Sequence, residues 1–168
     1  MSDDASFEAL AMPLFDALFN YARWLTHDAN EAEDLVQETY LKAFRGFRSF
    51  MPGTNFRAWI YRILRNTFLT SRSGLRAVVS IDDDPDRFES IGVTETPESQ
   101  LLQRATGQAL ERAILELALP FREVLLLADI ENMSYKEIAE ALSIPVGTVT
   151  SRLLRARAKV RIALGGRK

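Results

Sequence analysis

The stretch "SYKEIAEALSIPVGTVTSRLLRARAK", residues 134–159, decides the fold. Ser134 and Glu137 make a capping box, which predicts the start of a helix at this point. The turn "SIP" ends that helix, and the next helix carries Val149 and Leu153 on a narrow apolar arc. Two short helices joined by a tight turn predict a helix-turn-helix, in which the first helix braces the second. The second helix would offer its early side chains to base edges in the major groove of DNA.

The charge pattern points to a polyanionic partner. The net charge is only −2, but residues 39–81 hold eight basic and no acidic residues, and residues 143–168 hold seven basic and no acidic residues. Residues 1–38 carry nine acidic residues and one basic residue, and residues 82–98 carry seven acidic residues and one basic residue. Since a uniformly solvated surface would mix the signs, two separated basic blocks predict two sites on a polyanion. The alternative is two basic faces that only limit aggregation.

Composition excludes several classes of protein. The absence of an 18-residue apolar run and of a signal-peptide pattern predicts a cytoplasmic protein with no membrane insertion. With no cysteine and only His27, we expect neither a thiolate metal site nor a histidine cluster, and no cofactor. The acidic "DDDPD" lacks the glycine and glutamate of a calcium-binding EF-hand loop. No phosphate-binding, nucleophile-elbow or zinc-protease motif is present, so we do not expect an enzyme.

Helical periodicity covers the front of the chain. The N-terminus predicts either one amphipathic helix or a pair broken at Pro13, and Asp28 predicts the cap of a long helix. A Pro-Gly turn at residues 52–53, followed by Thr54 or Asn55 as cap, predicts a third helix. No useful β-alternation appears anywhere. The fold class expected is therefore all-α.

The periodicity disappears between Ser71 and Glu98, where proline, glycine and dense negative charge are typical of a flexible linker. We expect two small helical domains joined by this acidic linker. The first domain would span residues 1–74, the linker residues 75–97, and the helix-turn-helix domain residues 98–168.

Three segments also resemble a known family. "HDANEAEDLVQETYLKAFRGF" and "GTNFRAWIYRILRNTF" resemble region 2 of bacterial extracytoplasmic-function sigma factors of the sigma-70 family. "LPFREVLLLADIENMSYKEIAEALSIPVGTVTSRLLRARAKV" resembles region 4, which binds the promoter −35 element. The resemblance covers nearly the whole chain except the linker. It implies a helical bundle for region 2 and a helix-turn-helix for region 4.

The resemblance implies an RNA polymerase sigma factor that directs the core enzyme to −35 and −10 promoter elements and assists DNA melting. The implied partners are core RNA polymerase, through its β′ clamp helices and its β subunit, promoter DNA, and an anti-sigma factor acting in a stress response. "PLFDALFNYA" together with "TNFRAWIYRILRNTF" is similar to the subgroup controlled by zinc-containing, redox-responsive anti-sigma factors.

The same resemblance implies roles for region 2 residues. The helix with the "DLVQE" motif docks on the clamp helices in this family, which implies polymerase binding by Asp34, Gln37 and Glu38. A merely solvated acidic face is the simpler interpretation. On the third helix, a basic face with one aromatic side chain would hold the freed DNA backbone, and the preceding loop would capture an unpaired base. Helical phase also places Phe56 in the core. The implied −10 set is Asn55, Phe56, Arg57, Tyr61, Arg62, Arg65 and Asn66.

In the C-terminal domain, Arg122 matches a family position that contacts promoter DNA, and residues 150–154 match the segment that reads the −35 element. Position 150 is commonly basic in this motif, so threonine there removes a charged contact and alters the expected −35 preference. The −35 set is Arg122, Thr148, Thr150, Ser151, Arg152, Leu154, Arg155 and Lys159.

Two alternatives remain open at this stage. The chain could be an autonomous helix-turn-helix regulator whose N-terminal domain dimerises or senses a ligand. It could also be an interaction protein that mimics sigma domains and sequesters an anti-sigma factor. Binding to core polymerase and promoter-dependent transcription separate these alternatives from a sigma factor.

Overall fold

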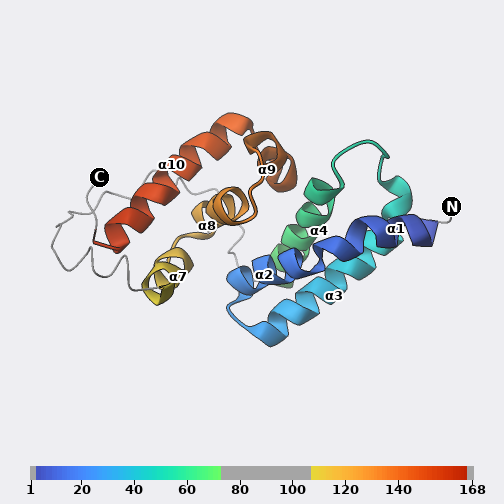
Figure 1. The fold of residues 1–168 in the computed structure, drawn as a ribbon, viewed down its shortest axis with the longest axis horizontal. Helices are drawn as coiled ribbons and strands as arrows, with labels where there is room; N and C mark the ends of the chain where they lie inside the picture. Colours follow the sequence, from blue (N-terminus) through green and yellow to red (C-terminus); the bar gives the residue numbers. More distant parts are fainter. Residues whose placement is uncertain (1–2, 73–106, 166–168) are drawn as a thin grey trace. The chain divides into compact units, whose positions relative to one another are not determined.

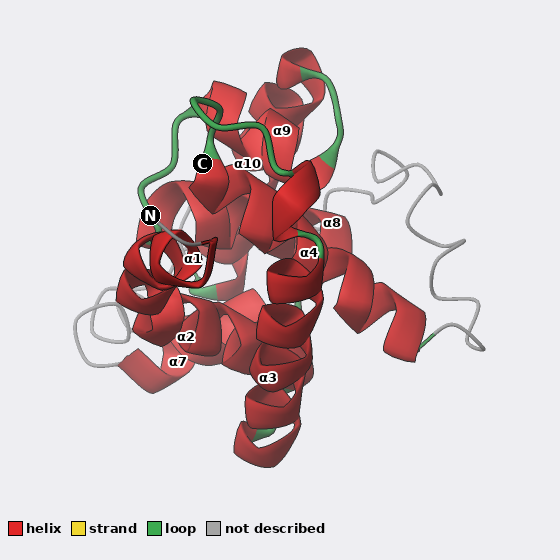
Figure 2. Ribbon diagram, turned by 90° about the vertical axis from the view of Figure 1, so that its right-hand side faces the viewer, coloured by secondary structure: helices red, strands yellow, loops and turns green. Residues whose placement is uncertain are grey.

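The computed structural model describes residues 3–72 and 107–165, and every regular element within these ranges is helical (Figure 2). The chain divides into two compact units. The first unit contains α1 to α4 and α9, and the second contains α7, α8, η4 and α10. The expected all-α fold class is confirmed. The expected acidic linker and the domain boundaries at residues 74 and 97 lie outside the described residues and stay predictions.

The N-terminus forms a proline-broken pair of helices, the second of the two expected alternatives. α1 (Asp3–Ala11) is followed by a 3-10 turn, η1 (Met12–Leu14), which holds Pro13 in its first positions, and then by α2 (Phe15–Thr26). Proline fits the first turn of a helix because the missing N–H has no partner there anyway. α2 ends at His27, whose φ of 66° is left-handed.

α3 (Ala29–Arg45) lies beside α2 and begins as the sequence predicts (Figure 1). The Asp28 carboxylate accepts hydrogen bonds from the N–H groups of Asn30 at 2.8 Å and Glu31 at 3.2 Å. These bonds satisfy two donors that a helix start leaves without partners. A 3-10 turn, η2 (Phe47–Ser49), follows. The residues buried on α3 are Ala32, Leu35, Val36, Thr39 and Ala43.

α4 (Phe56–Ser71) is the central helix of the first unit, because it packs against α2, α3 and α9 (Tyr135–Leu142). The Asn55 side chain accepts from the Ala58 N–H at 2.9 Å, which makes Asn55 the cap of the helix. Ser134 caps α9 by accepting from the Glu137 N–H at 3.0 Å, as the capping box predicts. The residues buried on α9 are Ile138, Ala141 and Leu142.

In the second unit α10 (Val146–Ala163) packs against α7 (Gly107–Leu115) and α8 (Leu119–Leu125). α8 continues into a π-helical turn, η4 (Leu126–Ile130). Asp129 of this turn forms a bidentate ion pair with Arg157 of α10, at 2.6 and 3.1 Å. The expected apolar arc is confirmed, since the buried residues of α10 are Val149, Leu153 and Ala156.

Within residues 3–72 and 107–165, no helix combines the length and the apolar character that crossing a membrane requires.

Candidate functional site

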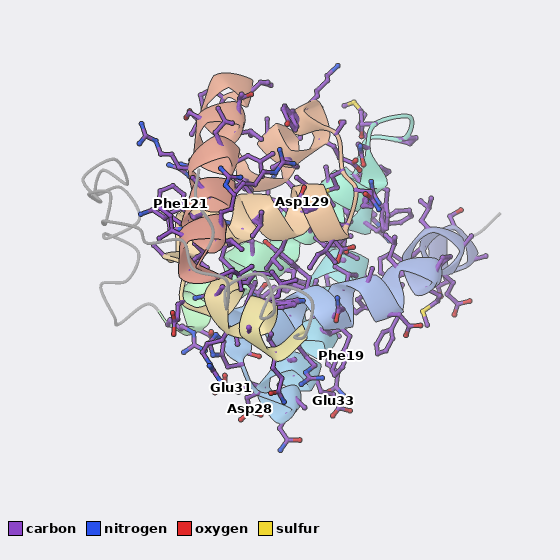
Figure 3. All side chains as sticks on the ribbon, turned by 60° about the vertical axis from the view of Figure 1, so that its left-hand side comes forward. Phe19, Asp28, Glu31, Glu33, Phe121 and Asp129 are labelled. Carbon is purple, nitrogen blue, oxygen red and sulfur yellow. The ribbon has the colours of Figure 1, made fainter. Side chains whose placement is uncertain are left out.

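The acidic residues expected to bind a protein partner border a groove between α3 and the end of α4. Asp34, Gln37 and Glu38 are all exposed on α3. The groove has a volume of about 460 Å³, and both Asp34 and Glu38 line it. The Glu38 carboxylate also lies 4.0 Å from the ammonium group of Lys42, one turn further along the helix. Asp28, Glu31 and Glu33 project from the first turns of the same helix (Figure 3), so this end of the first unit carries a concentrated negative charge.

The far wall of this groove comes from α4, which the sequence did not indicate. Thr70, Ser71 and Arg72 line it, and the Arg72 guanidinium forms an ion pair with Glu31 at 3.1 Å. Arg72 also lies 4.7 Å from the centre of the Phe68 ring. The ion pair connects the end of α4 to the start of α3. The acidic face of α3 therefore lies opposite a wall of α4 that contains the ring of Phe68 and the hydroxyl groups of Thr70 and Ser71.

A second hollow, of about 500 Å³, lies at the loop between α3 and α4. Gly53 lies in its wall and has a φ of 91°, a conformation that favours glycine. Phe47, Phe50 and Phe56 also line it, beside exposed residues of the loop. Aromatic walls next to a polar loop suit a flat base that has left its stack. The lining residues that the sequence analysis did not assign to base capture are Ser6, Leu10, Phe47 and Arg48. The density of phenylalanine in "FRGFRSF" was the available signal.

Phe56 belongs to the core, as its helical phase predicts. Its side chain is 7% exposed, and its ring lies 5.3 Å from that of Phe50 and 5.5 Å from that of Trp59. Tyr61 corrects an expectation. It was placed on the exposed basic face of α4, but it is 1% exposed and packs against the ring of Tyr21 at 5.3 Å. α4 packs against α2 as well as against α3, so more of its circumference is buried than a single neighbouring helix would cover. Tyr61 lies in this additional buried part.

The remaining predicted −10 residues lie on α4 or at its N-cap. Arg57, Arg62 and Arg65 are half-buried, while Asn55 and Asn66 are exposed. Arg57 donates two hydrogen bonds to the Glu137 carboxylate of α9, from Nε at 2.7 Å and from Nη2 at 2.8 Å. The bonds from Arg57 hold the pKa of Glu137 below its ordinary value, with smaller contributions in the same direction from Asn55 and from the backbone of Ser134.

Arg62 makes a similar contact with the main chain of α9. Its Nε and Nη2 donate to the carbonyl oxygen of Glu140 at 3.1 and 2.9 Å. This carbonyl belongs to the last turn of α9, where the next available N–H, that of Ile144, bonds to Ala139 instead. Arg57 and Arg62, two of the three arginines of the predicted DNA-binding face, therefore contact α9.

The start of α10 presents the predicted −35 residues away from its buried arc. Thr150, Ser151 and Arg155 are exposed and Leu154 is 63% exposed, while Thr148 and Arg152 are half-buried. An exposed leucine near the start of a helix can contact a thymine methyl group, and the hydroxyl groups can bond to base edges. The arrangement can therefore supply both apolar and polar contacts to a groove.

Arg122 and Lys159 of the −35 set also contact other helices of the second unit. The Arg122 guanidinium donates to the carbonyl oxygens of Leu115 at 3.0 Å and Leu117 at 3.1 Å, and so caps the end of α7. The Lys159 ammonium lies 5.5 Å from the centre of the Phe121 ring. Both side chains are half-buried, so each reaches solvent only in part. Among the described residues, no three His, Asp or Glu side chains cluster as metal ligands.

Two protein-family models match this chain, one in its N-terminal part and one in its C-terminal part. The family described as sigma-70 region 2 matches residues 10–78, and the family described as sigma-70 region 4 matches residues 107–160. These segments include the acidic groove, the aromatic hollow, the basic face of α4 and the start of α10.

Curated relatives agree with this assignment. The ECF RNA polymerase sigma factor SigE of Mycolicibacterium smegmatis is 34% identical over 94% of this chain and 64% of its own length, so the chain spans less than two thirds of that relative. The RNA polymerase sigma-H factor of Pseudomonas aeruginosa is 33% identical over 96% of this chain and 88% of its own length. The ECF RNA polymerase sigma-E factor of Escherichia coli is 34% identical over 77% of this chain and 71% of its own length.

Two solved structures are similar. The sigma factor RpoE of Bartonella quintana, in complex with the anti-sigma factor NepR, superposes with a TM-score of 0.72 and 28% identity over 95% of this chain and 96% of that chain. CnrH in complex with the cytosolic domain of CnrY superposes with a TM-score of 0.64 and 28% identity over 94% of this chain and 86% of that chain.

Proposed function

This chain belongs to the extracytoplasmic-function sigma factors of the sigma-70 family, and from that membership we propose that it directs core RNA polymerase to promoters through three surfaces of its own. A sigma factor is not an enzyme, because the polymerase carries out the chemistry of RNA synthesis. The observation that carries the proposal is the pairing of a region 2 match at residues 10–78 with a region 4 match at residues 107–160 in one chain.

The first surface is the acidic face of α3, which we assign to core polymerase. Asp34, Gln37 and Glu38 are exposed at the groove or beside it, so a partner helix can reach all three without rearrangement. A partner that carries basic side chains would complement this face, and the groove wall from α4 adds apolar area at its edge. In the proposal the partner is the β′ clamp helices, with the β subunit as a further polymerase contact.

The second surface is the loop between α3 and α4 together with the basic face of α4, which we assign to the −10 element. The hollow beside Gly53 receives an unpaired base, and Asn55, the cap of α4, lies in the chain between Thr54 and Phe56, which line it. Arg57, Arg62, Arg65 and Asn66 hold the backbone of the melted strand. Phe56 contributes from the core, as a wall of the hollow. Tyr61 is left out of this contact set, because its ring lies among the buried residues.

The third surface is the start of α10, which we assign to the −35 element. Thr150, Ser151 and Leu154 read base edges, and Thr148, Arg152, Arg155 and Lys159 contact the edges or the phosphates beside them. Arg122, which caps the end of α7, completes this contact set as a contact to the DNA backbone. In this assignment region 2 spans residues 1–74 and region 4 spans residues 98–168.

We extend the proposal to regulation. An anti-sigma factor would hold this chain inactive in the cytoplasm until a stress releases it, as suggested by the resemblance to RpoE of Bartonella quintana, whose structure contains the anti-sigma factor NepR. The narrower proposal, a zinc-containing and redox-responsive anti-sigma factor, rests on the sequence resemblance of the N-terminal segments. Since this chain has no cysteine, the redox-sensing thiols would belong to that partner.

The proposal is tested with purified core polymerase and a run-off template that carries the promoter region of the chain's own gene. We expect a transcript whose start depends on the added chain, and co-elution of the chain with core polymerase in a pull-down. An autonomous regulator would bind the template but give no new transcript. A sigma mimic would bind an anti-sigma factor but not the core enzyme. Either of these results would reject the proposal.

A further inference from the structure

The N-terminal helix α1 contributes a wall to the hollow at the loop between α3 and α4. Ser6 and Leu10 line the hollow, and because they lie one helical turn apart, both side chains share one face of α1. Leu10 is 41% exposed and Ser6 is half-buried. The other lining residues come from η2, from the loop that follows it and from the first residue of α4. Two segments that are distant in the sequence therefore form this hollow together.

Two contacts fix α1 at the hollow. Phe7 is 6% exposed, and its ring centre lies 5.4 Å from that of Phe47 and 6.3 Å from that of Phe56. Both of these partner rings also line the hollow. At the end of α1, the Tyr40 hydroxyl donates to the Ala11 carbonyl at 2.6 Å. The two lining side chains of α1 therefore hold a defined position beside the aromatic walls.

The charge of α1 argues against a contact with the DNA backbone. Its sequence, DDASFEALA, contains three acidic residues and no basic residue. The sequence-independent affinity of a protein for DNA comes mainly from basic side chains at the phosphate groups, and carboxylates repel those groups. A helix of this composition does not strengthen the hold on the backbone. The contact that its lining side chains can add is a contact with the base itself.

Ser6 brings to the hollow a hydroxyl that can recognise the edge of a base, because a serine hydroxyl both donates and accepts hydrogen bonds. The Thr54 hydroxyl, which also lines the hollow, donates to the Met51 carbonyl at 2.6 Å, so its proton is already used. Leu10 adds an apolar surface of the kind that fits a thymine methyl group. The hollow volume of about 500 Å³ lies within the range of about 300 to 1,000 Å³ for sites that enclose small ligands.

We propose that α1 selects the unpaired base that enters the hollow: the Ser6 hydroxyl bonds to the edge of the base, and Leu10 packs against it. A base without a matching group at its edge leaves the Ser6 hydroxyl without a partner, which lowers the affinity for that base. The aromatic walls accept any flat base, so the discrimination comes from α1. The inference rests on the proposed function, because it deepens the assignment of this hollow to the −10 element.

The test uses short fluorescein-labelled single strands that carry one base among abasic sites, so that only this base can enter the hollow. One strand is made for each DNA base, and a further strand is abasic throughout. Anisotropy measures binding to the full chain, and the base preference is the ratio of the highest to the lowest affinity among the strands that carry a base. We expect Ser6→Ala to reduce this ratio by about fivefold, as for the loss of one hydrogen bond, without a change for the abasic strand. No preference in the unmodified chain, an unchanged ratio in Ser6→Ala, or an equal loss for the abasic strand would overturn the proposal.

Ser6→Thr is the matched rescue variant, because it keeps the hydroxyl and should keep most of the base preference. A loss as large as that of Ser6→Ala would contradict a role for the hydroxyl. Alanine is a better helix former than serine, so Ser6→Ala should not unfold α1. The slope of log affinity against log salt concentration should also be the same in Ser6→Ala and in the unmodified chain, since a hydroxyl neutralises no phosphate. A smaller slope in the variant would place Ser6 at the backbone and would reject base selection.

Leu10→Ala tests the apolar part of the contact. It should weaken binding of the strands that carry a base by about threefold and leave the abasic strand unchanged, because apolar contact with the base is lost. Met12→Ala is the control, since Met12 is 54% exposed and is not among the residues that line the hollow. Equal losses in the two variants would reject the contact between Leu10 and the base.

The outcome is separable from that of the proposed function. If the unmodified chain gives no promoter-dependent transcript with core polymerase, the proposed function fails, yet the effect of Ser6→Ala on base preference is still measured with the free chain. If the transcript appears and Ser6→Ala keeps the full base preference, only the role of α1 fails.

Discussion

Phe56 could stabilise the fold by packing in the aromatic cluster, or it could contact an unpaired DNA base. Substitution of this residue separates the two roles. Its ring lies within 5.3 to 6.3 Å of the rings of Phe7, Phe47, Phe50 and Trp59, and its side chain is 7% exposed. Removal of a buried phenylalanine ring costs about 3 to 5 kcal/mol, because both transfer energy and packing are lost. This is a large share of the roughly 5 to 15 kcal/mol that stabilises a typical domain.

The assay is guanidinium denaturation of Phe56→Ala, followed by tryptophan fluorescence. The chain has two tryptophans, Trp24 and Trp59, and both lie in the first unit, so the signal reports the unit that contains the substitution. We expect the midpoint to fall while the slope of the transition stays unchanged. Met51→Ala is the control, since Met51 in the preceding loop is 65% exposed and should change stability by less than about 0.5 kcal/mol.

A cost below about 1 kcal/mol for Phe56→Ala would refute the packing argument, because it lies outside the range for a buried ring. If the packing argument is right, Phe56→Leu, which keeps much of the volume, should retain most of the stability. Loss of promoter opening in that variant would then report the base contact alone.

Three further predictions concern single side chains. Asp34→Lys should weaken core polymerase binding by about tenfold in a titration, while Glu33→Lys, which makes the same charge change one position earlier, should have a smaller effect; equal losses would point to net charge instead of a site. Arg152→Ala should cost about 1 to 3 kcal/mol of −35 binding in a mobility-shift assay, and unchanged affinity would remove Arg152 from the interface. Tyr40→Phe should destabilise the chain by about 1 kcal/mol on denaturation, because the Tyr40 hydroxyl donates to the Ala11 carbonyl at 2.6 Å. Burial, with a smaller contribution from the charge of Asp16, raises the pKa of Tyr40 to about 12. The stabilising contribution of Tyr40 is therefore present below pH 10 and is lost as the pH rises through about 12. The ultraviolet titration curve of Tyr40→Phe should lack one tyrosine that ionises near pH 12, and a difference from the unmodified chain that falls near pH 10 instead would contradict this assignment.

The parts of the fold that depend on residues close together in the sequence could be predicted from the sequence alone. Asp28, Asn55 and Ser134 cap helices because each side chain reaches an N–H two or three residues later, and that reach is set by local geometry. The buried arc of α10 followed from the spacing of Val149 and Leu153 alone, because one side of that helix packs and the other does not.

The parts that depend on distant segments could not be predicted in this way. Tyr61 was assigned to an exposed face because its phase differs from that of Phe56, but α4 packs against more than one helix and buries a second side. Phe44 of α3 is apolar and yet 46% exposed, which the sequence pattern of α3 alone does not show. The pairing of Arg57 with Glu137 joins residues 80 positions apart, and no local spacing rule reports such a contact. The roles of the site residues stay predictions that the experiments above address.

The π-helical turn at the end of α8 has a consequence for how this chain tolerates changes of length. A π turn accommodates one residue more than an α-helical turn, so deleting a residue from Leu126–Ile130 would let the backbone relax into an ordinary helix. The residues that follow would rotate by about 100° about the helix axis. Asp129 would then face away from Arg157, and the ion pair that joins η4 to α10 would be lost. A deletion that improves the local backbone would therefore remove a polar contact of the helix that carries the predicted −35 residues, while its apolar packing on α8 would remain.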